Sequence, residues 1–191
     1  KAYTDLSVDR SGRDHLSSIP KSSMFPISTY YRMELAEILP KEIHRVLFLD
    51  GDMIIRHSLV DLWNTDLDNY AYAAVHDNTE GTISYYNRLQ YKSKYGYFNS
   101  GVMLINLDYW RDHIITSQMM DYIDQYPERI LYCDQDVFNF IMHGKIKPLH
   151  FKYNLQNGFL CEPKDMICDY CGYKDEIEEA KKKPVIVHFT A

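Results

Sequence analysis

The sequence predicts an α/β fold in which short apolar strands alternate with amphipathic helices. Apolar runs of four or five residues recur along the chain, and segments with helical spacing lie between them. Several of these runs end in acidic or amide side chains, as in open α/β sheets whose strand ends face a ligand crevice. The expected strands are residues 46–49, 71–75, 102–106 and 185–189.

The first expected element is a helix over residues 28–39. Ser28 and Thr29 favour a helix N-terminus, strong helix formers follow, and Pro40 cannot extend the helix. The preceding residues, 1–26, are polar and rich in serine, which indicates a loop or a short helix.

The most informative segment comes next, where the apolar run 46–49 ends in Asp50-Gly51-Asp52. The run predicts a buried strand of the parallel type whose C-terminal end faces a ligand crevice. Because side chains alternate along an extended backbone, Asp50 and Asp52 are expected on one side, and Gly51 would let a ligand approach closely. Two carboxylates on one side suit a hard divalent cation such as Mn²⁺ or Mg²⁺.

Two other interpretations of this segment stay open on the residues alone. Aspartates that flank a glycine also form turns, in which their carboxylates accept hydrogen bonds from backbone N–H groups. A strand that ends in Asp-x-Asp also opens the active site of haloacid-dehalogenase-like phosphohydrolases, where the first aspartate is the nucleophile. The return to apolar residues at 53–55 favours a carboxylate pair between two short strands over that nucleophile loop.

Further polar side chains lie next to later strands. The strand at 71–75 is followed by His76 and Asp77, and Asn99 shortly precedes the strand at 102–106. A second strand therefore also delivers an acid at its C-terminal edge.

The remaining expected elements are a helical turn at 58–63, an amphipathic helix from Asp108 to Ile123, a second helix from Asp134 to Gly144, and a charged helix at 174–183. Asp134 and Asp136 have a sufficient structural explanation, because carboxylates stabilise the positive end of a helix dipole. His188 lies near the end of the last strand, where a lone histidine is more often structural than a ligand.

Composition limits the classes of function. The chain has 191 residues, of which 46% are hydrophobic, so one domain with a sizeable core is expected. Its formal net charge of −6 argues against nucleic acid as a partner, because that binding needs clustered lysine and arginine. Apolar runs stay far below the ~20 residues of a transmembrane helix, and no signal peptide is visible.

The four cysteines do not make a convincing metal site. Cys168 and Cys171 form a Cys-x-x-Cys pair, and only Cys161 lies nearby as a third ligand, whereas a closed zinc site needs four. Unpaired thiols in a reducing cytoplasm, with Cys133 among them, are the expected state.

Five segments occur in an order that is typical of one enzyme family. They are residues 29–32 (Thr-Tyr-Tyr-Arg), 46–52, 97–106, 133–136 and 187–190. On these segments the whole chain resembles glycosyltransferase family 8, which includes glycogenin and bacterial lipopolysaccharide galactosyl- and glucosyltransferases. The resemblance leaves little room for the phosphohydrolase interpretation.

The resemblance implies a GT-A fold, the Rossmann-like fold of nucleotide-diphospho-sugar transferases. This is a three-layer α/β sandwich with a mixed, mainly parallel sheet, expected here as one domain over residues 1–191. The implied activity is metal-dependent transfer of a hexose from UDP-glucose or UDP-galactose to a saccharide acceptor, with retention of the anomeric configuration. Lipopolysaccharide or a cell-surface glycan would be the acceptor.

The resemblance also implies roles for individual residues. Asp50, Asp52 and His188 resemble the ligands of the Mn²⁺ (or Mg²⁺) that holds the donor diphosphate. Positions that resemble donor-binding residues are Arg32, Asp50, Gly51, Asp77, Asn99 and Asp134. Gln135, with Asp134 beside it, resembles the catalytic position closest to the anomeric carbon. Because glutamine is a poor nucleophile, attack on the same face of an oxocarbenium-like centre explains retention better than a double displacement.

The metal ligands come from distant segments. We expect Asp50, Asp52 and His188 to converge because each would end a strand at the same edge of the sheet.

The sequence departs from the family pattern at both ends. Family members usually begin with an apolar strand and an Asp-containing loop that bind the nucleoside, and they continue after the histidine strand with residues that contact the diphosphate. We therefore expect a piece of a longer cytoplasmic protein, in peripheral contact with the inner face of the membrane through a C-terminal segment beyond residue 191. The alternative is a degenerate, non-catalytic module that binds nucleotide-sugars or glycans.

Overall fold

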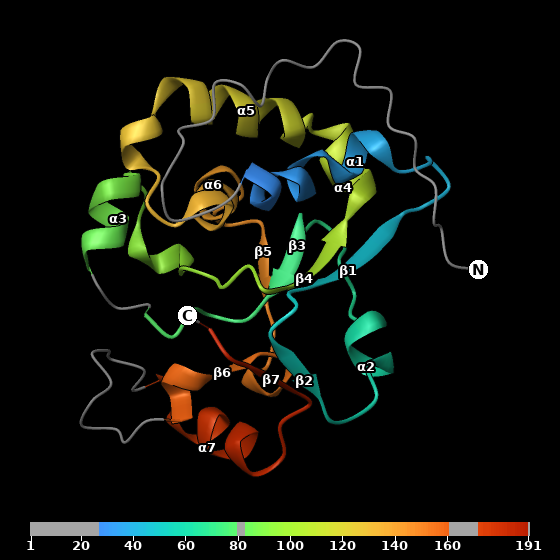
Figure 1. The fold of residues 1–191 in the computed structure, drawn as a ribbon, viewed down its shortest axis with the longest axis vertical. Helices are drawn as coiled ribbons and strands as arrows, with labels where there is room; N and C mark the ends of the chain where they lie inside the picture. Colours follow the sequence, from blue (N-terminus) through green and yellow to red (C-terminus); the bar gives the residue numbers. More distant parts are fainter. Residues whose placement is uncertain (1–26, 80–82, 161–171, 191) are drawn as a thin grey trace.

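The computed structural model describes residues 27–79, 83–160 and 172–190, which form two sheets flanked by helices (Figure 1). The first sheet, called sheet A, has the strand order β1-β4-β3-β5, and sheet B has the order β2-β7-β6. The strands of sheet A are β1 Arg45–Leu49, β4 Val102–Asn106, β3 Tyr72–Ala74 and β5 Ile146–Pro148. Those of sheet B are β2 Met53–Ile55, β7 Ile186–His188 and β6 Leu155–Gln156.

The strand directions correct one expectation. Three of the described pairings are antiparallel, namely β1 with β4, β3 with β4, and β2 with β7. Two are parallel, β3 with β5 and β6 with β7. The α/β class and the mixed pairing are confirmed, but the expectation of mainly parallel pairing is wrong for the described strands.

The surroundings of β1 explain why the apolar run at 46–49 wrongly predicted a strand of the parallel type. Within the described residues β1 pairs only with β4, and all of its residues are half-buried. Val46 and Phe48 pack against one core cluster, whereas Leu47 and Leu49 pack against another. The run is apolar because both faces of an edge strand are covered, and this requirement does not depend on strand direction.

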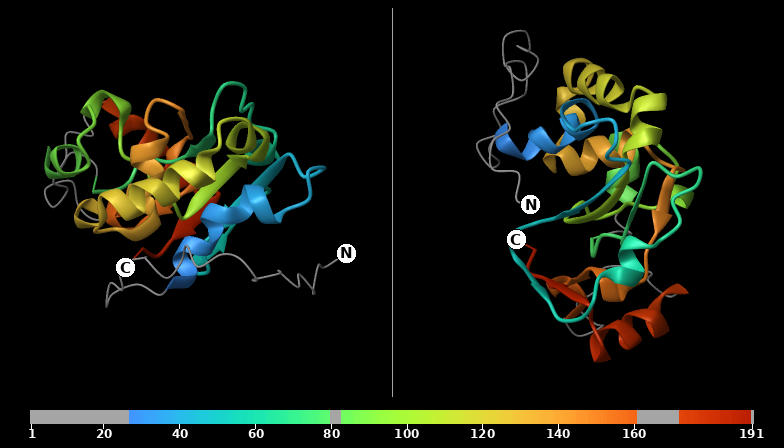
Figure 2. Two further views of the ribbon diagram at one scale, coloured as in Figure 1. Left: turned by 90° about the horizontal axis from the view of Figure 1, so that it is seen from above. Right: turned by 90° about the vertical axis from the view of Figure 1, so that its right-hand side faces the viewer.

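The layers follow from this alternation along sheet A. Tyr72 and Met103 point into a core shared with helices on one side, and Val75 and Leu104 point into a core shared with sheet B and helix α7 (Lys174–Lys182) on the other. Figures 1 and 2 show these helices on one side of sheet A and sheet B with α7 on the opposite side. The fold is therefore a sandwich with sheet A in the middle.

The α-helices are α1 Leu35–Ile38, α2 Val60–Trp63, α3 Ile83–Leu89, α4 Leu107–Asp112, α5 Ile115–Gln125, α6 Cys133–Ile141 and α7 Lys174–Lys182. Short 3₁₀ helices lie at η2 Ile27–Glu34, η3 Ser93–Tyr95, η4 Pro127–Arg129, η5 Phe151–Tyr153 and η6 Asn157–Leu160.

Two helix predictions need correction. The helix expected over 28–39 is a 3₁₀ helix in its first part and becomes an α-helix only at α1. The helix expected from Asp108 to Ile123 is divided into α4 and α5 at Ile114, whose φ of 47° lies in the left-handed region. Asn106, not Asp108, caps α4, because its side chain accepts a hydrogen bond from the Tyr109 N–H.

In the described part of the chain, no helix combines the length and the apolar character that crossing a membrane requires. Cys133 is a free, buried thiol. Cys161, Cys168 and Cys171 lie outside the described residues, so the prediction about a zinc site stays a prediction.

Candidate active site

A cleft of about 930 Å³ opens where the ends of the sheet A strands meet sheet B. Its walls come from η2, the segment between β1 and β2, the segment after β3, the start of α6, and β7. Every residue that the sequence singled out lines this cleft: Arg32, Asp50, Gly51, Asp52, Asp77, Asn99, Asp134, Gln135 and His188.

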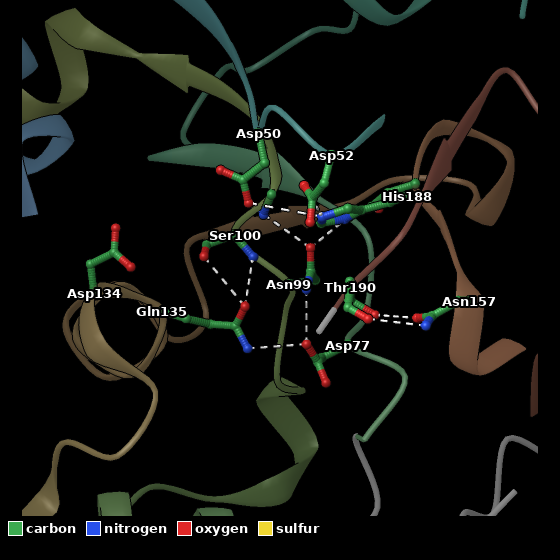
Figure 3. Close-up of polar contacts among 12 residues, drawn as sticks. Asp50, Asp52, Asp77, Asn99, Ser100, Asp134, Gln135, Asn157, His188 and Thr190 are labelled. Carbon is green, nitrogen blue, oxygen red and sulfur yellow. Dashed lines mark hydrogen bonds and ion pairs between the residues drawn. The ribbon is translucent and has the colours of Figure 1, made fainter. Parts of the chain in front are cut away.

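Asp50, Asp52 and His188 form a triad at one end of the cleft (Figure 3). One ligand atom from each lies within 4.8 Å of the others. His188 Nε2 is 3.2 Å from Asp52 Oδ1 and 3.9 Å from Asp50 Oδ2. The expected convergence is confirmed, and the role of these residues as metal ligands stays a prediction.

The reason for the convergence differs from the expected one. Asp50 follows β1 in sheet A, whereas Asp52 and His188 are brought together in sheet B, where Met53 pairs with His188. The Phe189 N–H donates to the Asp52 carbonyl at 3.0 Å and closes the same ladder. The triad therefore spans two sheets and not one sheet edge.

Gly101 leaves the space that the triad occupies. A Cβ atom on Gly101 would lie 2.2 Å from His188 Cε1 and 2.9 Å from Asp50 Oδ2. Only glycine permits this approach. Sequence reasoning did not single out Gly101, although its position directly before β4 and two residues after Asn99 was visible.

The donor set of the triad fits a divalent cation. Two carboxylates and one imidazole nitrogen suit a cation such as Mn²⁺, which accepts both oxygen and nitrogen ligands. Burial raises the pKa of Asp50 above its ordinary value, while the charge of Arg32 acts in the opposite direction. A cation at the triad would favour the ionised carboxylate further.

Arg32 and Asp134 form a buried ion pair beside the triad. The Arg32 Nε–H donates to Asp134 Oδ2, and its other N–H groups reach the Ser100 carbonyl at 2.8 Å, Ser100 Oγ at 3.0 Å and Asp50 Oδ1 at 3.4 Å. Burial opposes the charge of Arg32, but the field of Asp134 and the hydrogen bond to it raise its pKa above the ordinary value. The guanidinium lies over the Phe48 ring at 4.6 Å. These contacts hold the guanidinium in place between η2, α6 and the segment before β4.

Gln135 is held from both ends of its amide (Figure 3). Its Oε1 accepts from the Ser100 N–H at 3.0 Å, and its Nε2 donates to Asp77 Oδ2 at 3.0 Å and to the Tyr97 hydroxyl at 3.2 Å. Asp77 Oδ2 also accepts from Asn99 Nδ2 at 3.1 Å. Because a backbone N–H can only donate, the orientation of the Gln135 amide is fixed.

The sequence model of glycosyltransferase family 8 matches residues 3–191. The chain belongs to glycosyltransferase family 8. Two related enzymes are a lipopolysaccharide 1,2-glucosyltransferase of Escherichia coli, 33% identical over 73% of this chain, and a lipopolysaccharide 1,3-galactosyltransferase of Salmonella typhimurium, 27% identical over 81%. The chain covers 42% of the first enzyme and 47% of the second, so it spans about half of their length.

Solved structures show the same fold. The galactosyltransferase LgtC, in complex with donor and acceptor sugar analogues, superposes with a TM-score of 0.78 over 93% of this chain and 63% of its own, at 26% identity. A second LgtC structure, with equal TM-score and identity over 93% of this chain and 64% of its own, is of an active-site mutant in which glutamate replaces glutamine. The family 8 chain therefore has the expected GT-A fold.

Two further residues of the family 8 chain, Asp136 and Tyr97, support the cleft without having been assigned to the site from the sequence. Asp136 is fully buried and accepts hydrogen bonds from Arg88 at 2.7 Å, from the Tyr97 hydroxyl at 2.8 Å and from the Tyr132 N–H at 2.7 Å. Burial, with the charge of Asp136, raises the pKa of Tyr97 well above its ordinary value, so Tyr97 is a neutral donor to Asp136. Tyr97 also accepts from Gln135 and so contacts two neighbouring residues of α6.

Proposed function

We propose that the full-length protein is a metal-dependent, retaining hexosyltransferase that uses UDP-glucose or UDP-galactose as donor. One observation carries the proposal: a triad suited to a divalent cation and a rigidly held glutamine lie in one cleft of a family 8 chain. The relatives that act on lipopolysaccharide support a saccharide acceptor of that kind.

The triad would bind the cation that holds the donor diphosphate. When bound, this cation supplies Lewis-acid stabilisation of the negative charge that develops on the departing UDP. Asp50 and Asp52 contribute charge, and Gly101 leaves room for His188 to approach them. Asp52 is 51% exposed in the cleft, so it can meet a ligand without rearrangement of the core.

The other end of the cleft would bind the donor hexose. Asp77, Asn99 and Asp134 offer carboxylate and amide groups for sugar hydroxyls, and Arg32 donates to Asp134 and holds it in place. Gln135 lies among them with an oriented amide dipole. We assign Gln135 to stabilisation of the oxocarbenium-like centre during attack of the acceptor on the same face, since an amide is a poor nucleophile. The active-site glutamine of LgtC agrees with this role.

We further propose that the protein acts in the cytoplasm at the inner face of the membrane, where an acceptor of the lipopolysaccharide type is available. Its relatives are about twice as long as this chain, so segments outside residues 1–191 would complete the nucleotide and acceptor sites.

The test is a donor screen of the full-length protein with Mn²⁺. Transfer or slow hydrolysis of UDP-glucose or UDP-galactose is expected, with loss of activity on chelation and recovery on addition of Mn²⁺. Asp61→Asn on the exposed side of α2 serves as a charge-matched control for Asp52→Asn, because Asp61 does not line the cleft. If no UDP-hexose is consumed while nucleotide-sugar binding persists, the protein is the non-catalytic module instead.

A further inference from the structure

Asn154 contacts the metal-ligand candidate His188 from behind. Asn154 Oδ1 lies 3.0 Å from His188 Nδ1, the ring nitrogen that does not face Asp52. Both side chains are buried, and the Asn154 side chain is completely excluded from solvent. The segment is fixed to the same sheet, because Leu155 of β6 pairs with Val187 of β7. Which ring nitrogen of a neutral histidine carries the proton is set by the partner of the other nitrogen.

The direction of this contact is determined by a chain of hydrogen bonds that begins at a backbone group. The Gly101 N–H, which can only donate, lies 2.9 Å from Asn99 Oδ1. At the opposite side of the same amide, Asn99 Nδ2 lies 3.1 Å from the Asp77 carboxylate. The orientation of the Asn99 amide is therefore fixed at both ends, and its Oδ1 is an acceptor.

The orientation of Asn154 follows from that of Asn99. Asn154 Nδ2 lies 2.8 Å from Asn99 Oδ1 and donates to it. A flipped Asn154 amide would place two oxygens in contact. Asn154 Oδ1 therefore faces His188 Nδ1, and because a carbonyl oxygen can only accept, Nδ1 carries the proton. In the neutral ring Nε2 then has a free lone pair, and this atom faces Asp52 and Asp50.

We propose that Asn154 is a positioning residue that holds His188 in the tautomer whose Nε2 binds the divalent cation. This inference rests on the proposed function, because it assigns a supporting residue to the same metal site. Partners of this kind typically account for a ten- to hundredfold effect on metal affinity.

The first measurement needs no variant. Nitrogen-15 NMR of the metal-free, full-length protein in mildly alkaline buffer reports the protonation of each ring nitrogen of His188. A proton on Nδ1 is expected. A His188 ring whose Nδ1 lacks the proton overturns the proposal.

The second measurement is Mn²⁺ affinity without nucleotide-sugar, from the electron paramagnetic resonance signal of free Mn²⁺. Asn154→Ala should weaken binding about ten- to hundredfold and remove the preference for the Nδ1 proton. Asn154→Asp keeps an oxygen acceptor for Nδ1 and should retain the proton and an affinity within about threefold of the unaltered protein. It should also lower the stability of the fold, because its second oxygen replaces the amide nitrogen that donates to Asn99 Oδ1. A change below about threefold in Asn154→Ala overturns the proposal.

Asn106→Ala is the matched control. Its amide also makes several hydrogen bonds, to the carbonyls of Leu67 and Tyr70 and from the Tyr109 N–H, but it lies outside the cleft. It should lower stability without changing the His188 tautomer or Mn²⁺ affinity. If Asn154→Ala does not fold, the spectrum of the unaltered protein and the Asn154→Asp affinity decide. A protein that binds Mn²⁺ as described but transfers no hexose refutes the proposed function and leaves this inference intact.

Discussion

Replacement of Gln135 by alanine separates a catalytic role from a structural one. The change removes the hydrogen bonds of the amide to the Ser100 N–H, to Asp77 and to the Tyr97 hydroxyl. Each such bond contributes about 0.5–1.5 kcal/mol net, and an alanine is a better helix former at this position. The free energy of unfolding should therefore fall by about 1–4 kcal/mol, which a domain with about 5–15 kcal/mol of stability tolerates.

The effect on turnover is what separates the two roles, because a purely structural role predicts no loss of kcat in the folded variant. If the oriented amide dipole stabilises the transition state, its loss should lower kcat about 10²–10³-fold, equal to roughly 2.7–4 kcal/mol, with little change in donor binding. The assay measures kcat for UDP-hexose transfer and donor Kd by calorimetry, with urea unfolding in parallel. Gln118→Ala is the control, because Gln118 is exposed on α5 and its side chain donates to no described group other than the His113 carbonyl. Turnover within about twofold of the unaltered enzyme would return Gln135 to a structural role.

Three further perturbations test the surroundings of the cleft. Asp52→Asn should abolish transfer at any Mn²⁺ concentration yet shift Tm by less than about 2 °C, because this half-exposed side chain belongs to no core; activity at saturating Mn²⁺ would contradict a direct metal role. Gly101→Ala should weaken Mn²⁺ binding about tenfold or more, because the added Cβ would displace His188 or Asp50; unchanged affinity in the same resonance assay would disprove the steric explanation. Asp136→Asn should lower the free energy of unfolding by about 2–4 kcal/mol, measured by urea unfolding. This is slightly less than the loss expected when a fully buried ion pair is broken, because Arg88 is partly exposed. A loss of only a few tenths of a kcal/mol would show that the Asp136 contacts do not stabilise this segment.

Local pattern was enough to predict the parts of the site that lie on one segment. The alternation of an extended backbone places Asp50 and Asp52 near one another, and the apolar residues on both sides predicted β1 and β2. His188 could be joined to them only through the family resemblance, because the β2–β7 pairing connects residues far apart in the chain. The direction of β1 was not predictable, since an edge strand covered on both faces has the same apolar pattern in either orientation.

The supporting residues were not predictable for a different reason. Tyr97, Asp136 and Asn154 act through hydrogen bonds that exist only after α6, β4 and β6 have packed together. Tyr97 and Asp136 lie within two of the five family segments and Asn154 lies in none, but no local pattern shows which hydrogen-bond partner each of them meets. The division of the helix at Ile114 is similar, because the left-handed residue turns the chain so that α5 packs against α6. Such a turn is determined by tertiary packing, and it cannot be predicted from the sequence when the residues on both sides keep helical spacing.

The connection between β1 of sheet A and β2 of sheet B is very short. Strand β1 ends at Leu49 and β2 begins at Met53, so the backbone passes from one sheet to the other through Asp50, Gly51 and Asp52 alone. One inserted residue would turn one carboxylate away and shift the pairing of β2 with β7 out of register. The length of this link is therefore as constrained as its composition. A change of donor preference should therefore be sought by substituting side chains around the cleft. Inserted residues should be tolerated only in connections remote from the cleft, such as the segment between α2 and β3.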